Sequence, residues 1–260
     1  MRYGIIDLGK GIAIILMIFF HIFYFPNVYG YEEFQWNTLS LNIIAKIAQF
    51  IFITFAGINI YLSYHSNKEK NKDKDYYKIF IKKHLTRIFK LSIIALSLSF
   101  FSYLIFGELW IKFGILHFMA LGSLLVTPYI DNQMINIFVI FLILLFKIFN
   151  KKLRQIFYFI PPKIAFISGL YTSYPSMDHF PLIPWLALMS IGLLIGKYIV
   201  TLKNKELIDN KNKNKNIISK SLSWIGKNSL EIYIVHWIIL YVFFSHIYPK
   251  FQLDPSVTVS

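Results

Sequence analysis

Long apolar runs alternate with short polar segments along almost the whole chain. A bilayer core about 30 Å thick needs roughly 20 mostly apolar helical residues, or about 17 at the short end. Seven runs come near this length: 11–25, 43–62, 88–106, 113–130, 135–149, 182–201 and 229–247. The pattern predicts an all-α fold, a polytopic membrane helix bundle with about seven transmembrane helices.

An eighth apolar run, 156–170, carries Pro161, Pro162 and Lys163 near its centre. Proline removes backbone donors and breaks a helix interior. We therefore expect this run to be re-entrant or to lie in the interface, within an outer loop at 150–181.

The distribution of Lys and Arg orients the bundle, because short cytoplasmic loops carry an excess of these residues. With seven spans and the N-terminus inside, the inner segments hold 19 of the 27 Lys and Arg residues. If 156–170 were an eighth span, the Lys-rich 197–227 segment would lie outside. We predict an N-in/C-out topology, basic cytoplasmic loops at 63–87 and 203–227, and a single integral membrane domain over 1–260. The charged residues around 203–220 are expected to form a solvated loop.

Composition supports a membrane protein over other classes. Hydrophobic residues make up 56% of the chain and charged residues 15%, against about 25% charged in soluble proteins. The net charge of +14 would suit nucleic acid, but the lysines lie in blocks between apolar runs, which is typical of membrane proteins. We therefore expect the lipid bilayer as a partner, and no nucleic acid. The absence of cysteine excludes disulfides, thiolate metal sites and a Cys nucleophile.

Ionisable groups inside membrane spans are costly and are by default candidates for function. The predicted topology brings polar side chains to the outer ends of several spans: His21, Asn42, Lys46, Gln49, His117, Asp178 and His179. Imidazoles beside a carboxylate can form a general base with an orienting acid. His21, His117 and Asp178 are therefore the catalytic candidates.

Each of these residues also has a structural interpretation. A membrane histidine such as His21 can simply donate to a carbonyl on a neighbouring helix, and Lys46 can snorkel to the interface. Asp178 can cap the helix entered through Pro181, and His179 can be a surface residue. His236 lies well inside the last run, too deep for snorkelling, although an interhelical hydrogen bond would account for it.

Other motifs point to packing or are missing. The seven histidines show no HxxxH or HExxH spacing, so we expect no metal. The GxSxG motif of serine hydrolases is absent. Gly192 and Gly196 fit GxxxG helix packing.

Five segments, in order, resemble motifs of prokaryotic heparan-α-glucosaminide N-acetyltransferase-like membrane proteins. They are IDLGKGIAIILMIFFH at 6–21, FITFAGI at 52–58, FGILH at 113–117, DHFPLIPW at 178–185 and WIGKNSLEIYIVH at 224–236. The last also resembles a C-terminal element of acyltransferase-3 type proteins. The resemblance implies a transmembrane acyltransferase that moves acetyl from cytosolic acetyl-CoA to an amine or hydroxyl of an extracytoplasmic or lipid-linked sugar.

Under this resemblance, His21 or His117 would be the base or a transient acetyl carrier, and Asp178 would fix the imidazole tautomer. Residues expected at the site of the acyl-CoA donor are Asp7, Lys10, Lys82, Lys83 and Arg87. Residues expected to contact the sugar or glycolipid acceptor are Lys46, Gln49, His179, Trp185 and His236.

The chain departs from the family at two points. The usual Arg-Gly of the opening motif is Lys10-Gly11, which replaces a planar donor by a point charge. Residues 26–42 contain no histidine, whereas the lysosomal enzyme has one soon after its first helix; His21 is the nearest substitute.

Two other functions stay open. Intramembrane His and Asp could couple protons in a transporter or flippase, and the chain could be a membrane scaffold. The resemblance implies the plasma membrane of a prokaryote, and a homo-oligomer is compatible with it.

Overall fold

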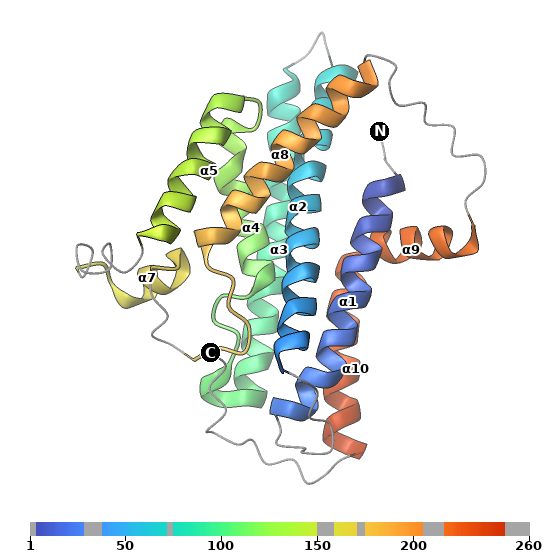
Figure 1. The fold of residues 1–260 in the computed structure, drawn as a ribbon, viewed down its shortest axis with the longest axis vertical. Coiled ribbons are helices and arrows are strands. Elements are labelled where there is room, and N and C mark those ends of the chain that lie inside the picture. The colour runs from blue at the N-terminus through green and yellow to red at the C-terminus, as the bar shows by residue number, and fades with distance from the viewer. Residues whose placement is uncertain are drawn as a thin grey trace. The chain divides into compact units, whose positions relative to one another are not determined.

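A computed structural model describes residues 4–28, 38–71, 75–149, 159–170, 175–204 and 216–247. These residues are almost entirely helical (Figure 1), and they contain no β-strand, only one isolated β-bridge. The helices are α1 (Gly4–Val28), α2 (Thr38–Lys70), α3 (Tyr76–Phe106), α4 (Ile115–Val126), α5 (Gln133–Ile148), α7 (Pro162–Ser168), α8 (Leu182–Asn204), α9 (Ile217–Lys227) and α10 (Ser229–Ile247). Two 3-10 turns, η2 (Gly107–Leu109) and η3 (Thr127–Tyr129), follow α3 and α4.

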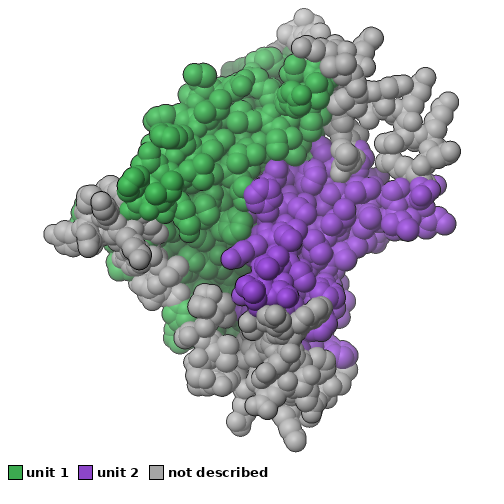
Figure 2. All heavy atoms as spheres, viewed as in Figure 1, with its two compact units in different colours: residues 1, 56–209, 259 green, residues 2–55, 210–258, 260 purple. Residues whose placement is uncertain are grey.

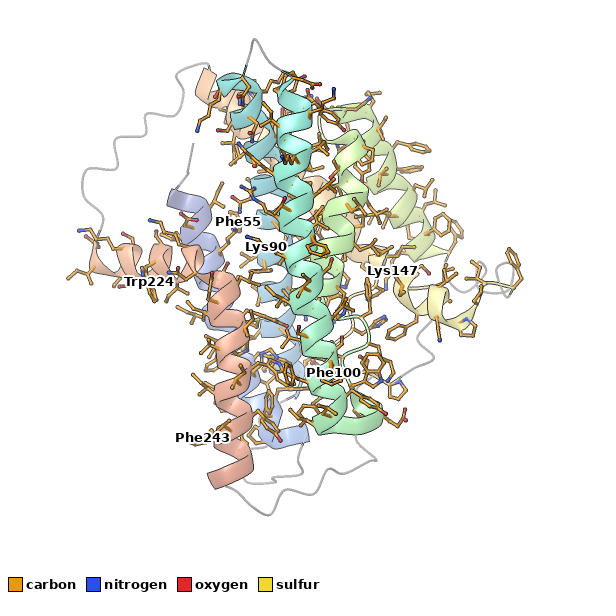
Figure 3. All side chains as sticks on the ribbon, turned by 180° about the vertical axis from the view of Figure 1, so that it is seen from behind. Phe55, Lys90, Phe100, Lys147, Trp224 and Phe243 are labelled. Atoms are coloured by element: carbon orange, nitrogen blue, oxygen red, sulfur yellow. The ribbon has the colours of Figure 1, made fainter. Side chains whose placement is uncertain are left out.

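Each of the seven candidate spans falls on a helix. Helices α1, α2, α3 and α8 are long and apolar enough to cross a membrane, and α4, α5 and α10 are shorter apolar helices. Large apolar side chains such as Phe100 on α3 and Phe243 on α10 are exposed (Figure 3), as expected of helices that contact lipid. The prediction of an all-α membrane helix bundle is confirmed. The number of crossings and their orientation remain predictions.

The eighth apolar run contains one short helix. α7 is seven residues long, or about 10 Å, and ends at Gly169 in the left-handed region (φ 88°), where glycine is favoured. This helix is too short to cross a bilayer. Residues 156–158 of the run lie outside the described residues.

Both basic segments were expected to be loops, and most of their described residues are helical instead. Residues 63–70 end α2 and 76–87 begin α3. Residues 217–227 form α9, because apolar residues recur there at helical spacing between Ser and Lys residues. Residues 205–215 of the second basic segment lie outside the described part of the chain.

The chain divides into two compact units (Figure 2). Unit 1 contains residues 56–209, which include the second part of α2, then α3 to α8. Unit 2 contains residues 2–55 and 210–258, which include α1, the first part of α2, α9 and α10. That 1–260 form a single integral membrane domain stays a prediction.

In unit 1, glycines bring the backbones of α2 and α8 together. A Cβ at Gly57 would overlap the carbonyl oxygen of Met189 and lie 3.0 Å from the Cα of Gly192. A Cβ at Gly196 would lie 2.9 Å from the Cβ of Tyr61. The predicted GxxxG packing is therefore confirmed.

In unit 2, α1 packs against both α9 and α10. The contact with α9 is close enough to need glycine on each helix: a Cβ at Gly11 would overlap the carbonyl oxygen of Leu222, and a Cβ at Gly226 would overlap that of Asp7. α9 lies crosswise to α1 (Figure 1). This crossing fixes the first turns of α1 relative to α9 and α10.

Candidate functional site

Two histidines from distant parts of the sequence meet in unit 2. The ring centroids of His21 on α1 and His236 on α10 are 5.1 Å apart, with one ring edge-on to the other. Aromatic rings of Tyr24, Phe25 and Tyr233 lie within 6.3 Å of one or the other imidazole. The structure thus brings together two of the predicted site residues in an apolar, aromatic setting.

The hydrogen bonds of the two rings fix their tautomers. His21 Nδ1 lies 2.8 Å from the carbonyl oxygen of Met17, and His236 Nδ1 lies 3.2 Å from that of Ile232. Because a carbonyl only accepts, Nδ1 carries the hydrogen in both rings. Nε2 is then the basic atom of each neutral imidazole. Within the described residues, the buried Nε2 of His236 has no hydrogen-bond partner.

The pair lies well inside the helices that carry it. His21 is ten residues beyond Gly11, where α1 meets α9, or about 15 Å along the helix axis. His236 is seven residues beyond the start of α10, or about 10 Å. Polar groups at this depth in apolar helices are costly, so they mark a candidate site.

In unit 1, the FGILH and DHFPLIPW segments lie side by side. The Phe180 N–H donates to the Phe113 carbonyl at 2.9 Å, and Phe113 and His179 form an isolated parallel bridge. Just before the two motifs, Ser176 Oγ accepts from the Lys112 N–H at 3.2 Å and donates to the Asp178 carbonyl at 2.9 Å. Two motifs about 60 residues apart therefore form one local structure at the start of α4.

His117 uses both ring nitrogens within this structure. Its Nδ1 accepts from the Gly114 N–H at 3.3 Å, so Nε2 carries the hydrogen and donates to Ser99 Oγ at 3.1 Å. Ser99 in turn donates to the Ile111 carbonyl at 2.6 Å. In this arrangement His117 caps the start of α4 and links it to α3. Its predicted catalytic role stays a prediction.

Asp178 also lies at the start of α4. Its Oδ2 accepts from the Ile115 N–H at 3.0 Å and leaves no room for a Cβ at Gly114. Burial raises the pKa of this carboxyl from 3.8 to about 6, although the Ile115 N–H opposes the rise. Asp178 thus caps α4, not the helix entered through Pro181, and its ionisation falls near neutral pH.

The neighbouring candidates His179 and Trp185 are half-buried. The His179 ring stacks on Phe166 of α7 with 3.9 Å between centroids, and its Nε2–H donates to the Phe166 carbonyl at 2.9 Å. Burial lowers the pKa of His179, while that hydrogen bond raises it. The Trp185 ring lies 5.2 Å from that of Phe180. Their assignment to the acceptor stays a prediction.

The basic candidates for the donor lie on two units. In unit 1, Lys82, Lys83 and Arg87 are exposed on α3. Lys83 Nζ donates to Asn67 Oδ1 at 3.3 Å, and Arg87 donates to Ser63 Oγ at 3.1 Å. Such exposed cations suit phosphate oxygens.

The remaining candidates lie in unit 2. Asp7 is buried and Lys10 is half-buried in the first turns of α1. On α2, Lys46 is exposed and Gln49 is half-buried. The described residues contain no cluster of three or more His, Asp or Glu side chains that could hold a metal ion.

Comparison with known proteins decides the family. The sequence profile described as "Heparan-alpha-glucosaminide N-acetyltransferase, catalytic" matches residues 2–238. The chain belongs to this family. No curated protein and no solved structure matches the chain significantly. Membership in this N-acetyltransferase family implies an acetyltransferase enzyme, and the long apolar helices make the chain an integral membrane protein.

The structure gives a physical reason for several glycines in the N-acetyltransferase motifs. Gly11 of the opening motif and Gly226 of the last motif form the crossing of α1 and α9, and Gly57 lies against α8. Gly114 of FGILH faces the Asp178 carboxylate. The motifs therefore hold the bundle together at backbone contacts as well as carrying polar side chains.

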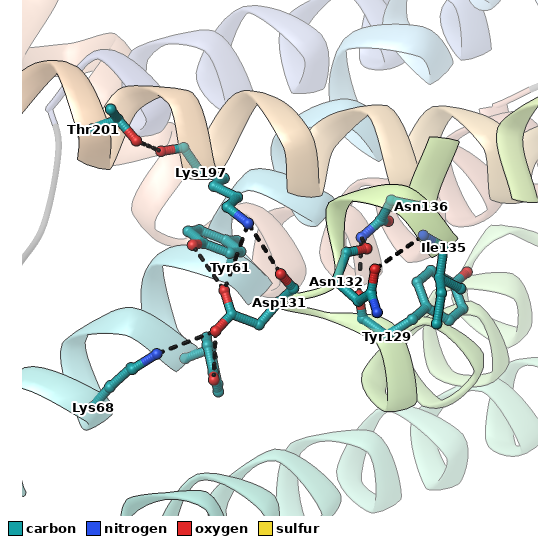
Figure 4. A network of polar contacts seen from close by, with 10 residues as sticks. Tyr61, Lys68, Tyr129, Asp131, Asn132, Ile135, Asn136, Lys197 and Thr201 are labelled. Carbon is teal, nitrogen blue, oxygen red and sulfur yellow. Dashed lines mark hydrogen bonds and ion pairs between the residues drawn. The ribbon is translucent and has the colours of Figure 1, made fainter. Parts of the chain in front are cut away.

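One polar cluster was not expected from the sequence. The Asp131 carboxylate accepts from Tyr61 at 3.3 Å, from Tyr64 at 3.1 Å and from Lys68 at 3.2 Å (Figure 4). Lys197 of α8 donates to the Asp131 carbonyl at 3.0 Å. Burial opposes ionisation of Asp131, but these partners outweigh it and lower the pKa of the carboxyl.

This cluster joins α2, α8 and the turn before α5, so its clear role is structural. The only signal in the sequence is a lone acidic residue between two apolar runs. His84, buried on α3 with its Nε2 3.3 Å from the Ser123 carbonyl, was also not singled out. Neither residue belongs to a recognisable motif, and their partners are distant in sequence.

Proposed function

We propose that the chain is a seven-span, N-in/C-out acetyltransferase of a prokaryotic plasma membrane. In this proposal it transfers acetyl from cytosolic acetyl-CoA to an amine or hydroxyl of an extracytoplasmic or lipid-linked sugar. The family match over residues 2–238 supports the reaction class. The observation that carries the choice of catalytic base is the ring contact between the half-buried His21 and the buried His236.

In the proposed step, His21 Nε2 takes the proton of the acceptor N–H or O–H while that nitrogen or oxygen attacks the thioester carbonyl. A C–N or C–O bond forms, the C–S bond breaks, and the thiolate of coenzyme A leaves and takes up a proton. The hydrogen bond from Nδ1 to the Met17 carbonyl supports this role, because it orients the ring and leaves Nε2 as the base.

His236 is proposed to contact the acceptor. Its Nε2 is buried and lacks a hydrogen-bond partner within the described residues. Leaving a buried nitrogen of this kind without a hydrogen bond costs free energy. A donor group of the bound sugar would satisfy it. In unit 1, Lys82, Lys83 and Arg87 are proposed to bind phosphates of the donor. In unit 2, the contribution of Lys10 and Asp7 to the donor site is a separate prediction.

His117 with Asp178 is the rival assignment for the base and its orienting carboxylate. The two residues cap the same helix start, and the raised pKa of Asp178 is typical of functional carboxyls. Against this assignment, both ring nitrogens of His117 are engaged by protein groups.

Transfer of labelled acetyl in isolated membranes distinguishes these assignments. Membranes containing the protein receive labelled acetyl-CoA, with endogenous acceptors and added glucosamine as the probe acceptor. We expect His21→Ala to lower the rate by about 10²–10⁴-fold, the usual contribution of a general base. The matched control is His65→Ala, since His65 lies in the last turns of α2, in unit 1, and pairs with Glu69.

A folded His21→Ala protein with the rate of the unsubstituted chain would reject His21 as the base. If His117→Ala lost activity and His21→Ala did not, His117 with Asp178 would replace His21 as the assigned base. Label that crosses the membrane without forming a new amide or ester would instead favour a transporter.

A further inference from the structure

Helix α9 has an unusual distribution of exposed side chains. Ile217, Ile218 and Trp224 are 82%, 73% and 62% exposed, and Trp224 projects from α9 in Figure 3. Ser223 and Gly226, in contrast, are buried. Packing among the described residues of unit 2 does not explain an 11-residue helix with large apolar side chains outside and small residues inside.

Residues seven apart lie on the same face of a helix, so eight of the eleven residues of α9 form four stripes about 90° apart. Of the other three, the exposed Ser221 lies between the two apolar stripes, and Leu222 and Ser223 lie toward α1. Two neighbouring stripes are apolar, and the third is small and packs on α1 through Gly226. The fourth stripe carries the exposed Lys220 and Lys227. The stripes, in order around the helix, are Ile217/Trp224, Ile218/Ile225, Ser219/Gly226 and Lys220/Lys227.

This order suits a helix that lies in a membrane surface beside α1. When the small stripe faces α1, Ile218 and Ile225 point to one side of the α1–α9 plane and the two lysines point to the opposite side. Trp224 then points away from α1, between the two. Tryptophan prefers that position at the interface between lipid and water.

The position of α9 next to α10 also agrees with a location at the membrane surface. Only Asn228 separates α9 from α10. The first turn of α10 carries the exposed Glu231, and the exposed side chains beyond it are apolar and include Val235, Ile238 and Ile239. α9 therefore stands where the lipid-facing surface of α10 begins. Its own exposed apolar stripes continue that surface.

We propose that α9 is an in-plane membrane anchor. Ile218 and Ile225 lie at the boundary of the acyl chains, Trp224 lies at headgroup level, and Lys220 and Lys227 bind anionic phospholipid headgroups. α9 contains no acidic residue, so nothing within it neutralises the lysines. Basic amphipathic helices bind anionic surfaces in this way. That this is the cytoplasmic leaflet rests on the proposed N-in orientation; the anchor itself does not.

Spin-label accessibility tests the depth of each stripe. The chain contains no cysteine, so single cysteines can be labelled in the full-length protein after reconstitution into vesicles. We expect labels at Ile218 and Ile225 to collide preferentially with oxygen, and labels at Lys220 and Lys227 with a water-soluble nickel chelate. Phe100→Cys on α3 is the lipid-exposed control, and Lys78→Cys is the aqueous control.

The ratio of oxygen to nickel accessibility should be several-fold higher at Ile218 than at Lys227. Equal, water-like values at all four positions would show that α9 is solvated, and uniform protection from both reagents would show that protein covers it. Either result would overturn the proposal. Neither depends on acetyl transfer, so the proposed function can fail while the anchor stands.

A second experiment separates lipid headgroups from the phosphates of the donor. With the label at Trp224, replacing part of the phosphatidylcholine by phosphatidylglycerol should lower the mobility of the label. The Lys220→Gln/Lys227→Gln double variant should lose this response. If coenzyme A added to phosphatidylcholine vesicles gave the response and phosphatidylglycerol did not, the lysines would bind donor phosphate and the proposed lipid contact would be wrong.

Discussion

His21 and His117 use their ring nitrogens in different ways. Both nitrogens of His117 bond to groups within unit 1, the Gly114 N–H and Ser99 Oγ. His21 bonds through Nδ1 to a carbonyl of its own helix, which leaves Nε2 as the base. A proton acceptor for a bound substrate needs such a nitrogen, and this difference underlies the choice of His21.

The candidate residues could be named from the sequence, but not their partners. His21 and His236 were each singled out because imidazoles are rare in apolar runs. Their pairing joins helices at opposite ends of the chain, and no spacing in the sequence indicates it. The hydrogen bonds of His117 also could not be predicted from the sequence. Ser99 lies in an apolar run, and nothing in its spacing distinguishes it from the other serines there.

Asp178 predicts a specific dependence of stability on pH. Its pKa is about 6 in the folded protein, against 3.8 ordinarily, so the folded state holds the proton more tightly. Stability from this group is therefore present below about pH 4 and is lost as the pH rises towards 6. Asp178→Asn keeps an acceptor for the Ile115 N–H but does not ionise.

We expect the melting temperature of Asp178→Asn, relative to the unsubstituted protein, to rise between pH 4.5 and pH 7.5. Melting both proteins in detergent at these pH values measures the difference. A difference that is constant or shrinks with pH would show that the carboxyl is not held protonated by burial. Other titrating groups cancel in the comparison, since the two proteins share them.

At the scale of elements, close backbone contacts explain why particular helices pair. The α1–α9 crossing needs Gly11 and Gly226, and the α2–α8 contact needs Gly57 and the Gly192–Gly196 pair. The GxxxG pair could be recognised from sequence because its spacing is known. The role of Gly226 could not be, since α9 itself was taken for part of a loop and only a partner helix explains the glycine.

Gly226→Ala should destabilise unit 2. The added methyl group overlaps the Asp7 carbonyl oxygen, and overpacking of this kind costs about 1–3 kcal/mol. Thermal unfolding in detergent should therefore begin at a lower temperature. Ser221→Ala, an exposed position on the same helix, is the matched control and should change little. If both variants melted like the unsubstituted protein, α1 and α9 would not cross at this contact.

For the whole molecule, the hydrophobic pattern was sufficient to place all seven apolar helices. Their ends were less accurate: α2 and α3 extend over 33 and 31 residues, well beyond the predicted apolar runs. Polar residues such as Asn67 and Lys83 continue these helices and bond between them. A hydropathy pattern cannot detect such extensions, because it identifies the apolar part of a helix and not the polar turns that continue it.

The orientation of the bundle is tested by cysteine labelling in intact cells. Lys70→Cys and Glu108→Cys lie near opposite ends of α3, just before it and just after it, and both positions are exposed. With the N-terminus inside, an impermeant maleimide should label Glu108→Cys in intact cells and Lys70→Cys only after permeabilisation. The reverse pattern, or labelling of both from one side, would contradict the predicted topology.

The most direct test of the account is whether acetyl crosses the membrane during transfer. Purified protein is reconstituted into vesicles with glucosamine trapped inside and labelled acetyl-CoA outside. The account predicts labelled N-acetylglucosamine in the lumen with the unsubstituted chain and about 10²–10⁴-fold less with His21→Ala. If the lumen gained no labelled product and product formed only after glucosamine was also added outside, or if both proteins gave equal rates, the account would be contradicted.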